Sequence, residues 1–256
     1  PFNAPHYPMH APQEYMDRFD DLPWDRQVMA AMISAVDDAI ASIRDELERL
    51  GLTENTLSVF TSDNGPSRES RNWLDGKQDP YYGGTSGGLK GHKFSLFDGG
   101  VKEPAIMSWP ARIPSGQVID QSCASMDIVP TVLEAVGADA SEYEIDGTSL
   151  LSHVASGDDL EDRTIFWEME GQTAVRRGKW KLVLKGQLVE DTDPIAEIHL
   201  SDVGNDPGES VNLAESEPTI TAELTKLAED WRASIEKRWE DDYASADYEY
   251  VAHGMV

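Results

Sequence analysis

The sequence predicts an α/β protein in which a layered sheet is followed by a small antiparallel sheet with one packing helix. Three observations lead to this prediction. An amphipathic segment at residues 24–50 is followed by a short apolar run at residues 56–62, which is the helix–strand unit of a layered sheet. Four short alternating segments follow after residue 160. A final amphipathic segment comes after them, at residues 217–239. We therefore expect two parts, residues 1–160 and residues 161–256.

Residues 24–50 are predicted to form one helix. Their apolar side chains recur at spacings of three and four, which places these side chains on one helical face. They are Met29, Met32, Ile33, Val36, Ile40, Ile43, Leu47 and Leu50. Gly51 is the expected end, because glycine readily adopts the backbone conformation that follows a helix.

The C-terminal part has the pattern of short strands. Alternating segments predict strands at residues 164–169, 173–177, 180–184 and 196–200. Residues 217–239 predict a closing helix. The apolar side chains that share one face of that helix are Ile220, Leu224, Leu227, Trp231 and Ile235.

The charge of the chain limits the classes of partner. Its 256 residues include 48 acidic and 21 basic side chains, a formal net charge of −27. This charge opposes binding to nucleic acids and to anionic membranes. No apolar run approaches the length of about 20 residues that spans a bilayer. Because salt screens the self-repulsion of an acidic surface, we expect a halophilic or marine source.

The segment before Pro66 predicts oxygen ligands at the end of a strand. Residues 57–60 are β-prone, and Asp63, Asn64 and Gly65 follow them closely. In open α/β sheets, the carboxyl ends of strands are the usual place for a site. A carboxylate beside an amide oxygen suits a hard cation such as calcium or magnesium. Asp63 and Asn64 are therefore predicted metal ligands.

A lysine follows in a glycine-rich turn. Lys93 lies in the run GHK at residues 91–93, and the run FDGGVKEP follows at residues 97–104. A cation together with a lysine suits an anionic tetrahedral group, either a sulfate or a phosphate. Residues 104–109 are predicted to form another buried strand.

These motifs resemble those of the type I, formylglycine-dependent sulfatases of the alkaline phosphatase superfamily. The resemblance rests on SDNG at residues 62–65, GHK at 91–93, FDGGVKEP at 97–104 and WP at 109–110. The family usually has Glu where Asp98 stands and Arg where Lys102 stands, so the charges are kept. The resemblance covers nearly the whole chain. It implies an alkaline-phosphatase-like layered sheet and a small C-terminal subdomain.

The resemblance also implies roles for individual residues. Asp63 and Asn64 would bind a divalent cation, with calcium as our expectation. Lys93 would neutralise charge on the sulfate. Residues 4–8 match an Ala-Pro-His-x-Pro segment of the family whose histidine touches the sulfate ester. His6 would therefore assist departure of the alcohol.

The loop at residues 65–90 contains further candidates for substrate binding. Arg68 and Arg71 lie there with aromatic neighbours, and arginines suit a sulfate group. His92, beside Lys93, is another candidate for substrate contact. For each of these residues, a position without any ligand role is an equally open interpretation.

One part of the family pattern is absent. Sulfatases of this type hydrolyse esters with a formylglycine made from the first residue of Cys-x-Pro-x-Arg or Ser-x-Pro-x-Arg. Cys123 is the only cysteine, and its context SCASM has no proline or arginine in register. We therefore expect this chain to be the C-terminal half of a sulfatase, inactive without a nucleophile segment upstream of Pro1.

The expected function is hydrolysis of sulfate esters, with sulfated carbohydrate as substrate. A phosphodiesterase or phosphonate hydrolase of the same superfamily stays open, because it shares the metal site. A non-catalytic module that binds sulfated glycans through Lys93, His6 and the arginine-bearing loop also stays open. The family favours a soluble periplasmic or extracellular protein.

Overall fold

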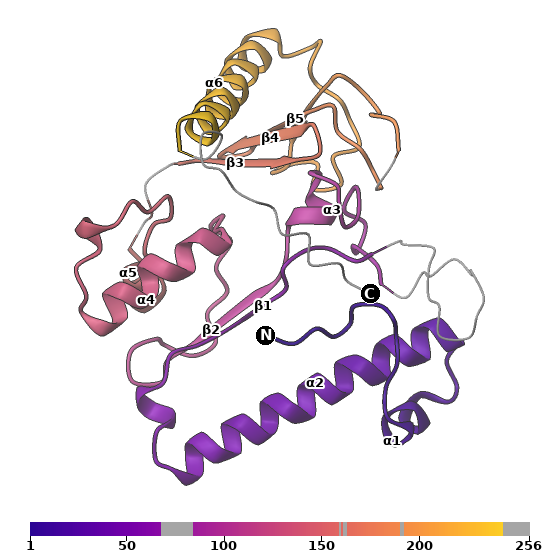
Figure 1. Ribbon diagram of the computed structural model, residues 1–256, viewed down its shortest axis with the longest axis vertical. Coiled ribbons are helices and arrows are strands. Elements are labelled where there is room, and N and C mark those ends of the chain that lie inside the picture. Colours follow the sequence, from indigo (N-terminus) through magenta and orange to yellow (C-terminus); the bar gives the residue numbers. More distant parts are fainter. Residues whose placement is uncertain (68–83, 159, 161–162, 190–191, 243–256) are drawn as a thin grey trace.

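The computed structural model describes residues 1–67, 84–158, 160, 163–189 and 192–242. Figure 1 shows helix α2 and the strand pair β1–β2 on one side, the sheet with helix α6 on the other, and the short helix α3 between them. The α-helices are α1 (Gln13–Met16), α2 (Trp24–Arg49), α3 (Asp98–Val101), α4 (Ile128–Val136), α5 (Leu151–Ser156) and α6 (Pro218–Asp242). Short 3-10 turns occupy Asp17–Phe19, Thr53–Asn55, Ser125–Asp127 and Ala140–Glu142.

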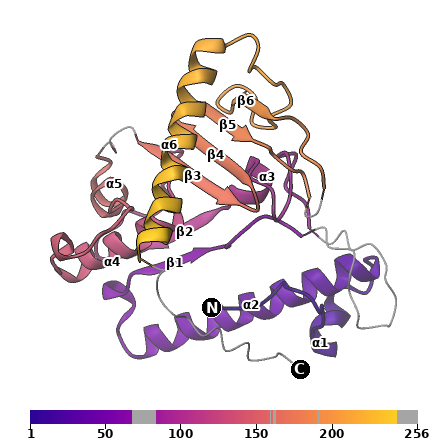
Figure 2. The same cartoon turned by 45° about the horizontal axis from the view of Figure 1, so that its top comes forward.

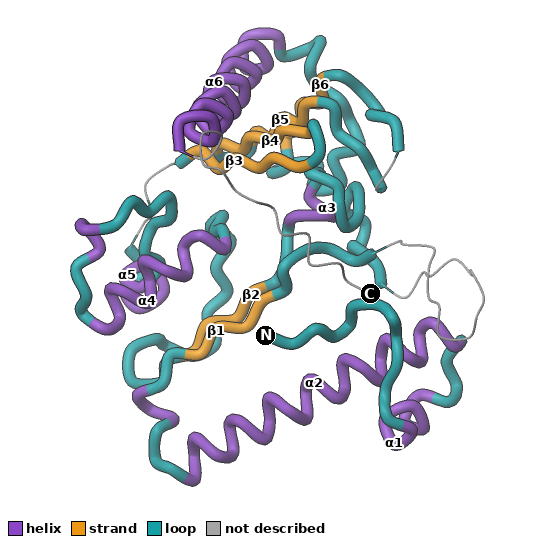
Figure 3. Tube along the Cα trace, viewed as in Figure 1, coloured by secondary structure: helices purple, strands orange, loops and turns teal. Residues whose placement is uncertain are grey.

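Helix α2 confirms the predicted long helix. It ends at Arg49, and Gly51 follows with a φ of 69°, in the left-handed region that glycine accepts without strain. Near its start, Val28 and Met32 pack with the buried Met9. This cluster anchors the N-terminal loop against α2, and Figure 3 shows the loop lying along that helix. The apolar face continues beyond the cluster, yet Ile43 is exposed.

Strands β1 (Ser58–Thr61) and β2 (Ala105–Ser108) pair antiparallel, with Thr61 opposite Ala105. Both were predicted as buried strands, and that prediction is wrong for the described chain. Phe60 is 49% exposed and Ile106 is 63% exposed. The reason is that the described residues supply only these two strands to the sheet, so its apolar faces lack the covering that their composition anticipates.

The four C-terminal strands form one antiparallel sheet in chain order, as Figure 2 shows. They are β3 (Thr164–Met169), β4 (Gln172–Arg177), β5 (Trp180–Leu184) and β6 (Ile198–Asp202). Three of the predicted strands agree within one residue, whereas β6 begins two residues later than predicted. Helix α6 confirms the predicted closing helix.

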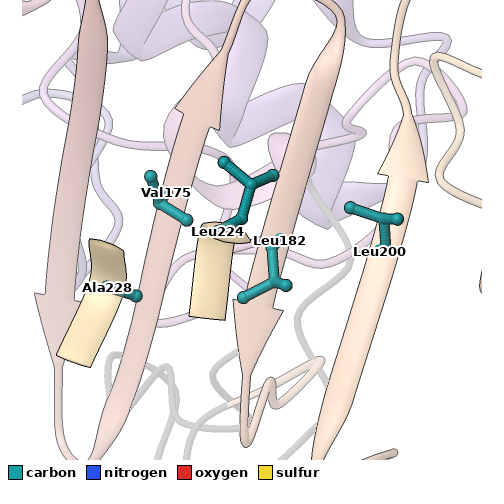
Figure 4. Packing of buried hydrophobic residues seen from close by; sticks show 5 residues of the cluster. All are labelled: Val175, Leu182, Leu200, Leu224 and Ala228. Carbon is teal, nitrogen blue, oxygen red and sulfur yellow. The ribbon is translucent and has the colours of Figure 1, made fainter. Parts of the chain in front are cut away.

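This sheet is buried on both faces. Helix α6 covers one face, where the fully buried cluster in Figure 4 consists of Val175, Leu182, Leu200, Leu224 and Ala228. Leu96 and Phe97 cover the other face and pack against Ala174 and Val183. Because neighbouring residues of a strand point to opposite faces, Val175 and Ala174 serve different cores. The sheet thereby carries α6 on one side and the segment leading into α3 on the other.

None of the described helices is both long and apolar enough to cross a bilayer.

We predict that Leu224→Ala destabilises the sheet and helix α6 by about 2–5 kcal/mol, because it leaves a cavity in a fully buried cluster. Ile235→Ala, at a partly exposed position of the same helix, is the matched control. Urea unfolding followed by circular dichroism measures both. Equal losses of unfolding free energy in the two variants would contradict the packing described.

Candidate functional site

Three backbone segments meet beyond the end of β1. They are residues 63–66, residues 90–95 and the turn of α3. Three hydrogen bonds join them: Gly65 N to Gly100 O at 3.0 Å, Gly99 N to Lys90 O at 2.7 Å, and Lys93 N to Pro66 O at 3.0 Å. The junction therefore brings the predicted metal-ligand segment and the lysine turn into direct contact.

The junction depends on glycine, because the backbones approach too closely for a side chain. A Cβ on Gly65 would lie 2.0 Å from Gly99 O, and a Cβ on Gly99 would lie 2.2 Å from Gly91 O. Both distances are far shorter than any carbon–oxygen contact in a stable protein. The glycines are thus required by space at these positions.

His6 and Lys93 lie in contact although 86 residues separate them in the sequence. Lys93 Nζ is 3.1 Å from His6 Nε2. The buried Met9 holds the loop that carries His6, and the hydrogen bond from Lys93 N to Pro66 O holds the turn that carries Lys93. Lys93 is half-buried, whereas His6 is exposed. The structure thus brings together the two residues predicted to contact the anion.

The contacts of His6 fit one tautomer of its ring. Its Nδ1 lies 2.7 Å from Tyr7 O, and a carbonyl oxygen only accepts, so Nδ1 carries the proton. An ammonium group only donates, so Nε2 accepts from Lys93. Both contacts are satisfied by the neutral imidazole protonated on Nδ1. His6 Nε2 can then accept a proton, and it can donate one only after the ring becomes charged.

Asp63 and Asn64 follow β1 as predicted, and the structure adds Glu103 as their neighbour. Asp63 is exposed. Asn64 donates its Nδ2 to Gly65 O at 2.9 Å, so only its amide oxygen could serve as the predicted metal ligand. Burial, and then the charge of Asp63, raises the pKa of Glu103. Pairing of β1 with β2 explains this proximity, because Glu103 lies two residues before the start of β2. Sequence reasoning missed it for lack of that pairing.

The remaining parts of the expected site, namely the calcium ion, His92, Arg68 and Arg71, stay predictions. Among the described residues, no group of three or more His, Cys, Asp or Glu side chains is placed to hold a metal ion, so the calcium site stays a prediction. His92 is half-buried beside Lys93, and its contact with substrate also stays a prediction. Arg68 and Arg71 lie outside the described residues.

A buried group of charges behind the junction was not found from the sequence. Lys181 and Glu209 are fully buried, and Asp98 is nearly so. Lys181 Nζ lies 2.5 Å from Asp98 Oδ1 and 3.6 Å from Glu209 Oε1. A lysine in an alternating strand is ordinarily expected to face solvent, so the sequence pattern of β5 does not indicate that Lys181 is buried. The only available signal was its place in a strand with apolar residues on both faces.

His199 lies beside this group. Its ring packs edge-on against Phe97 at 5.1 Å, and its Nε2 is 3.2 Å from Glu209 O. Burial, and then the charge of Lys90, lowers the pKa of His199 to about 4. Asp206 raises it slightly and Lys181 lowers it. The imidazole is therefore neutral and donates Nε2–H to the carbonyl oxygen.

Two family descriptions match the chain. Residues 1–138 match the family described as Sulfatase, and residues 91–237 match N-sulphoglucosamine sulphohydrolase, C-terminal. Arylsulfatase A of Homo sapiens is 30% identical over 248 residues, covering 87% of this chain and 46% of that protein. N-acetylgalactosamine-6-sulfatase of Canis lupus familiaris is 35% identical over 182 residues, covering 70% of this chain and 32% of that protein.

A solved structure has a similar fold. The crystal structure of Ps i-CgsB aligns with a TM-score of 0.71 at 25% identity, covering 90% of this chain and 48% of that chain. The same protein has been solved in complex with k-i-k-neocarrahexaose. These likenesses confirm the predicted α/β fold of the alkaline-phosphatase type. The chain spans less than half the length of arylsulfatase A and of this neighbour.

We predict that Gly65→Ala disrupts the junction, because its methyl group would meet Gly99 O. Overpacking of this severity costs about 3 kcal/mol or more. Gly204→Ala, whose methyl group would lie at least 3.3 Å from its neighbours, is the matched control. Thermal unfolding compares the two. A melting temperature for Gly65→Ala equal to that of the control would contradict the close approach.

We predict that His199→Gln flattens the pH dependence of stability between pH 6.5 and pH 4. An unfolded histidine takes up a proton near pH 6.5, whereas folded His199 does so only near pH 4. The unfolded state therefore binds more protons in this window, and the unfolding free energy falls as the pH falls. Urea unfolding at several pH values measures this slope, with His10→Gln at an exposed histidine as control. An unchanged slope in His199→Gln would contradict the assignment.

Proposed function

The chain belongs to the sulfatase family, and on that premise we propose that it carries part of the active site of a sulfuric ester hydrolase. The observation that carries the proposal is the 3.1 Å contact between Lys93 and His6. This contact joins the Lys93 ammonium group to the imidazole ring of His6, near the strand end that carries Asp63 and Asn64. A fixed cation beside a group that exchanges protons suits an ester whose leaving oxygen develops negative charge.

We propose that the sulfate lies against Lys93 and His6. The Lys93 ammonium would turn its protons from His6 Nε2 to the sulfate oxygens. His6 would then face an anion, which favours its charged form. In that form Nε2–H would donate to the bridging oxygen while Nδ1–H stays on Tyr7 O. His6 would in this way stabilise the departing alcohol.

We propose that Asp63 Oδ and the Asn64 amide oxygen hold a divalent cation. Both are hard oxygen donors at one strand end, which fits calcium. When bound, the cation would supply positive charge next to the sulfate. Glu103 would support this site electrostatically, since it lies close enough to Asp63 to be affected by its charge. The formylglycine nucleophile would come from a segment outside this chain.

We propose sulfated carbohydrate as the substrate class. The name of one relative, N-acetylgalactosamine-6-sulfatase, specifies a sulfated amino sugar, and a structural neighbour was solved with k-i-k-neocarrahexaose. Arg68, Arg71 and His92 are proposed to contact the sugar or its sulfate. A periplasmic or extracellular place at high salt is proposed from the family and from the net charge of −27.

We propose that the chain has two parts, residues 1–160 and residues 161–256. Two cores support this division, because one lies around Val28 and another lies between the C-terminal sheet and α6. A third core crosses the boundary, since Leu96 and Phe97 pack against Ala174 and Val183, and it would hold the two parts together. The exposed apolar side chains of β1 and β2 support the further proposal that another segment of the whole protein covers them. That segment would complete the layered sheet.

A fused protein tests the proposed function. We predict that joining this chain to the corresponding first half of a relative, with Cys-x-Pro-x-Arg converted to formylglycine, produces sulfate ester hydrolysis. Lys93→Ala should lower kcat by about 10²–10³, the loss typical of one charge-stabilising donor. Lys179→Ala, which removes a lysine paired with Asp202, is the matched control.

Turnover of an aryl sulfate and of an aryl phosphate is measured on each protein. Undiminished sulfate turnover by Lys93→Ala would refute the role of Lys93. Faster turnover of the phosphate than of the sulfate would favour a phosphoesterase of the same superfamily.

A further inference from the structure

A buried ionic network connects the C-terminal sheet to the candidate site. Lys181 projects from β5 and meets Asp98, the first residue of α3, at 2.5 Å. Glu209, from the turn after β6, lies 3.6 Å from the same ammonium. Figure 1 shows α3 lying between the sheet and the strands β1 and β2. The network thus occupies the boundary between the two.

Glu209 holds the start of α3 by a second contact. Its Oε2 accepts a hydrogen bond from Asp98 N at 2.6 Å. Its own carbonyl oxygen accepts from Lys90 Nζ at 2.8 Å. Glu209 has a φ of 48°, a left-handed conformation that is costly for a residue with a side chain. These contacts offset the cost of that conformation. They also attach Lys90 and Asp98, which flank the turn that carries Lys93, to one residue.

Hydrogen bonds also join the C-terminal part of the chain to the segment between Lys93 and Asp98. Gln172, at the start of β4, donates its Nε2 to Phe94 O at 2.8 Å. Ser95 donates its hydroxyl to Gln187 O at 2.6 Å. Phe94 has a φ of 71°, a strained conformation, and the turn is held by Gln172 of β4 and by Gln187 from the segment after β5.

A short path leads from the network to the proposed ligands. Asp98 is followed by Gly99 and Gly100, and Gly100 O accepts the hydrogen bond from Gly65 N. Gly65 directly follows Asn64. Asp98 therefore lies two residues along the chain from the carbonyl group that holds the residue after Asn64.

The energetics argue for a role beyond stability. Burying three charged groups carries a large desolvation cost, and replacing such an ionic group by well-packed apolar side chains of similar volume is often neutral or stabilising. Burial raises the pKa of Glu209, which is the expected sign of that cost. Stability alone would thus not select this arrangement, whereas a requirement for one geometry would.

We propose that Lys181, Asp98 and Glu209 are positioning residues by which the C-terminal sheet sets the placement of Gly65 and Lys93. That the placed segments form an active site rests on the proposed function. The mechanical coupling itself does not, because it follows from the contacts.

Amide hydrogen exchange on the full chain, followed by NMR, tests the coupling without substrate or metal. The variant Lys181→Met/Asp98→Asn/Glu209→Gln removes all three charges and keeps the shapes, so no unpaired buried charge remains. We expect the amides of Gly65 and Lys93 to exchange about tenfold faster, and the Leu200 amide in the sheet to stay within about twofold of the parent.

Lys179→Met is the matched control. Lys179 directly precedes β5 and is ion-paired with Asp202 at 2.6 Å, so its removal should leave the Gly65 and Lys93 amides unchanged. Unchanged exchange at Gly65 and Lys93 in the triple variant would overturn the proposal. Equal acceleration at Leu200 would overturn it too, since the network would then support the whole fold and not the site. Absence of sulfatase activity in the fused protein would leave these measurements unaffected.

Discussion

The close contact of the Gly65 backbone with Gly99 and Gly100 is the constraint on which the candidate site depends. This contact leaves no room for a Cβ on Gly65. It also holds three segments that are separate in the sequence against one another. The strand end that carries Asp63 and Asn64 is thereby joined to the turn that carries Lys93. His6 reaches that turn from the N-terminal loop, so the chemistry is assembled from residues far apart in the chain.

The C-terminal sheet supports this contact from behind. Helix α6 and the sheet enclose a core of fully buried apolar side chains, and such close packing resists deformation. From the opposite face of the sheet, Lys181 reaches Asp98 and Gln172 reaches Phe94. The helix–sheet unit is in this way connected by short polar contacts to the turn that carries Lys93, one of the residues proposed to bind the anion. The buried charges are expensive, and each is offset by an opposite charge or a backbone partner.

Local periodicity was sufficient for much of the fold. The spacing in residues 24–50 and the alternation after residue 160 predicted α2, α6 and most of the sheet, because these patterns reflect local geometry. Burial of β1 and β2 was predicted wrongly, since exposure depends on what covers a strand and not on the strand itself. The His6–Lys93 pair followed from family resemblance and not from spacing. Burial of Lys181 was not predicted, because a lysine in a strand normally faces water.

The sequence by itself determined which groups are available: a carboxylate and an amide at a strand end, a lysine in a glycine-rich turn, and a histidine in a proline-rich loop. It also determined the long helices α2 and α6, because the spacing of their apolar side chains is a local property of the chain. Only the tertiary structure decided that Lys93 donates to His6, that Glu103 lies beside Asp63, and that Lys181 is buried against Asp98. Such contacts join residues more than 30 positions apart, and no local pattern specifies distance, burial or charge pairing between them.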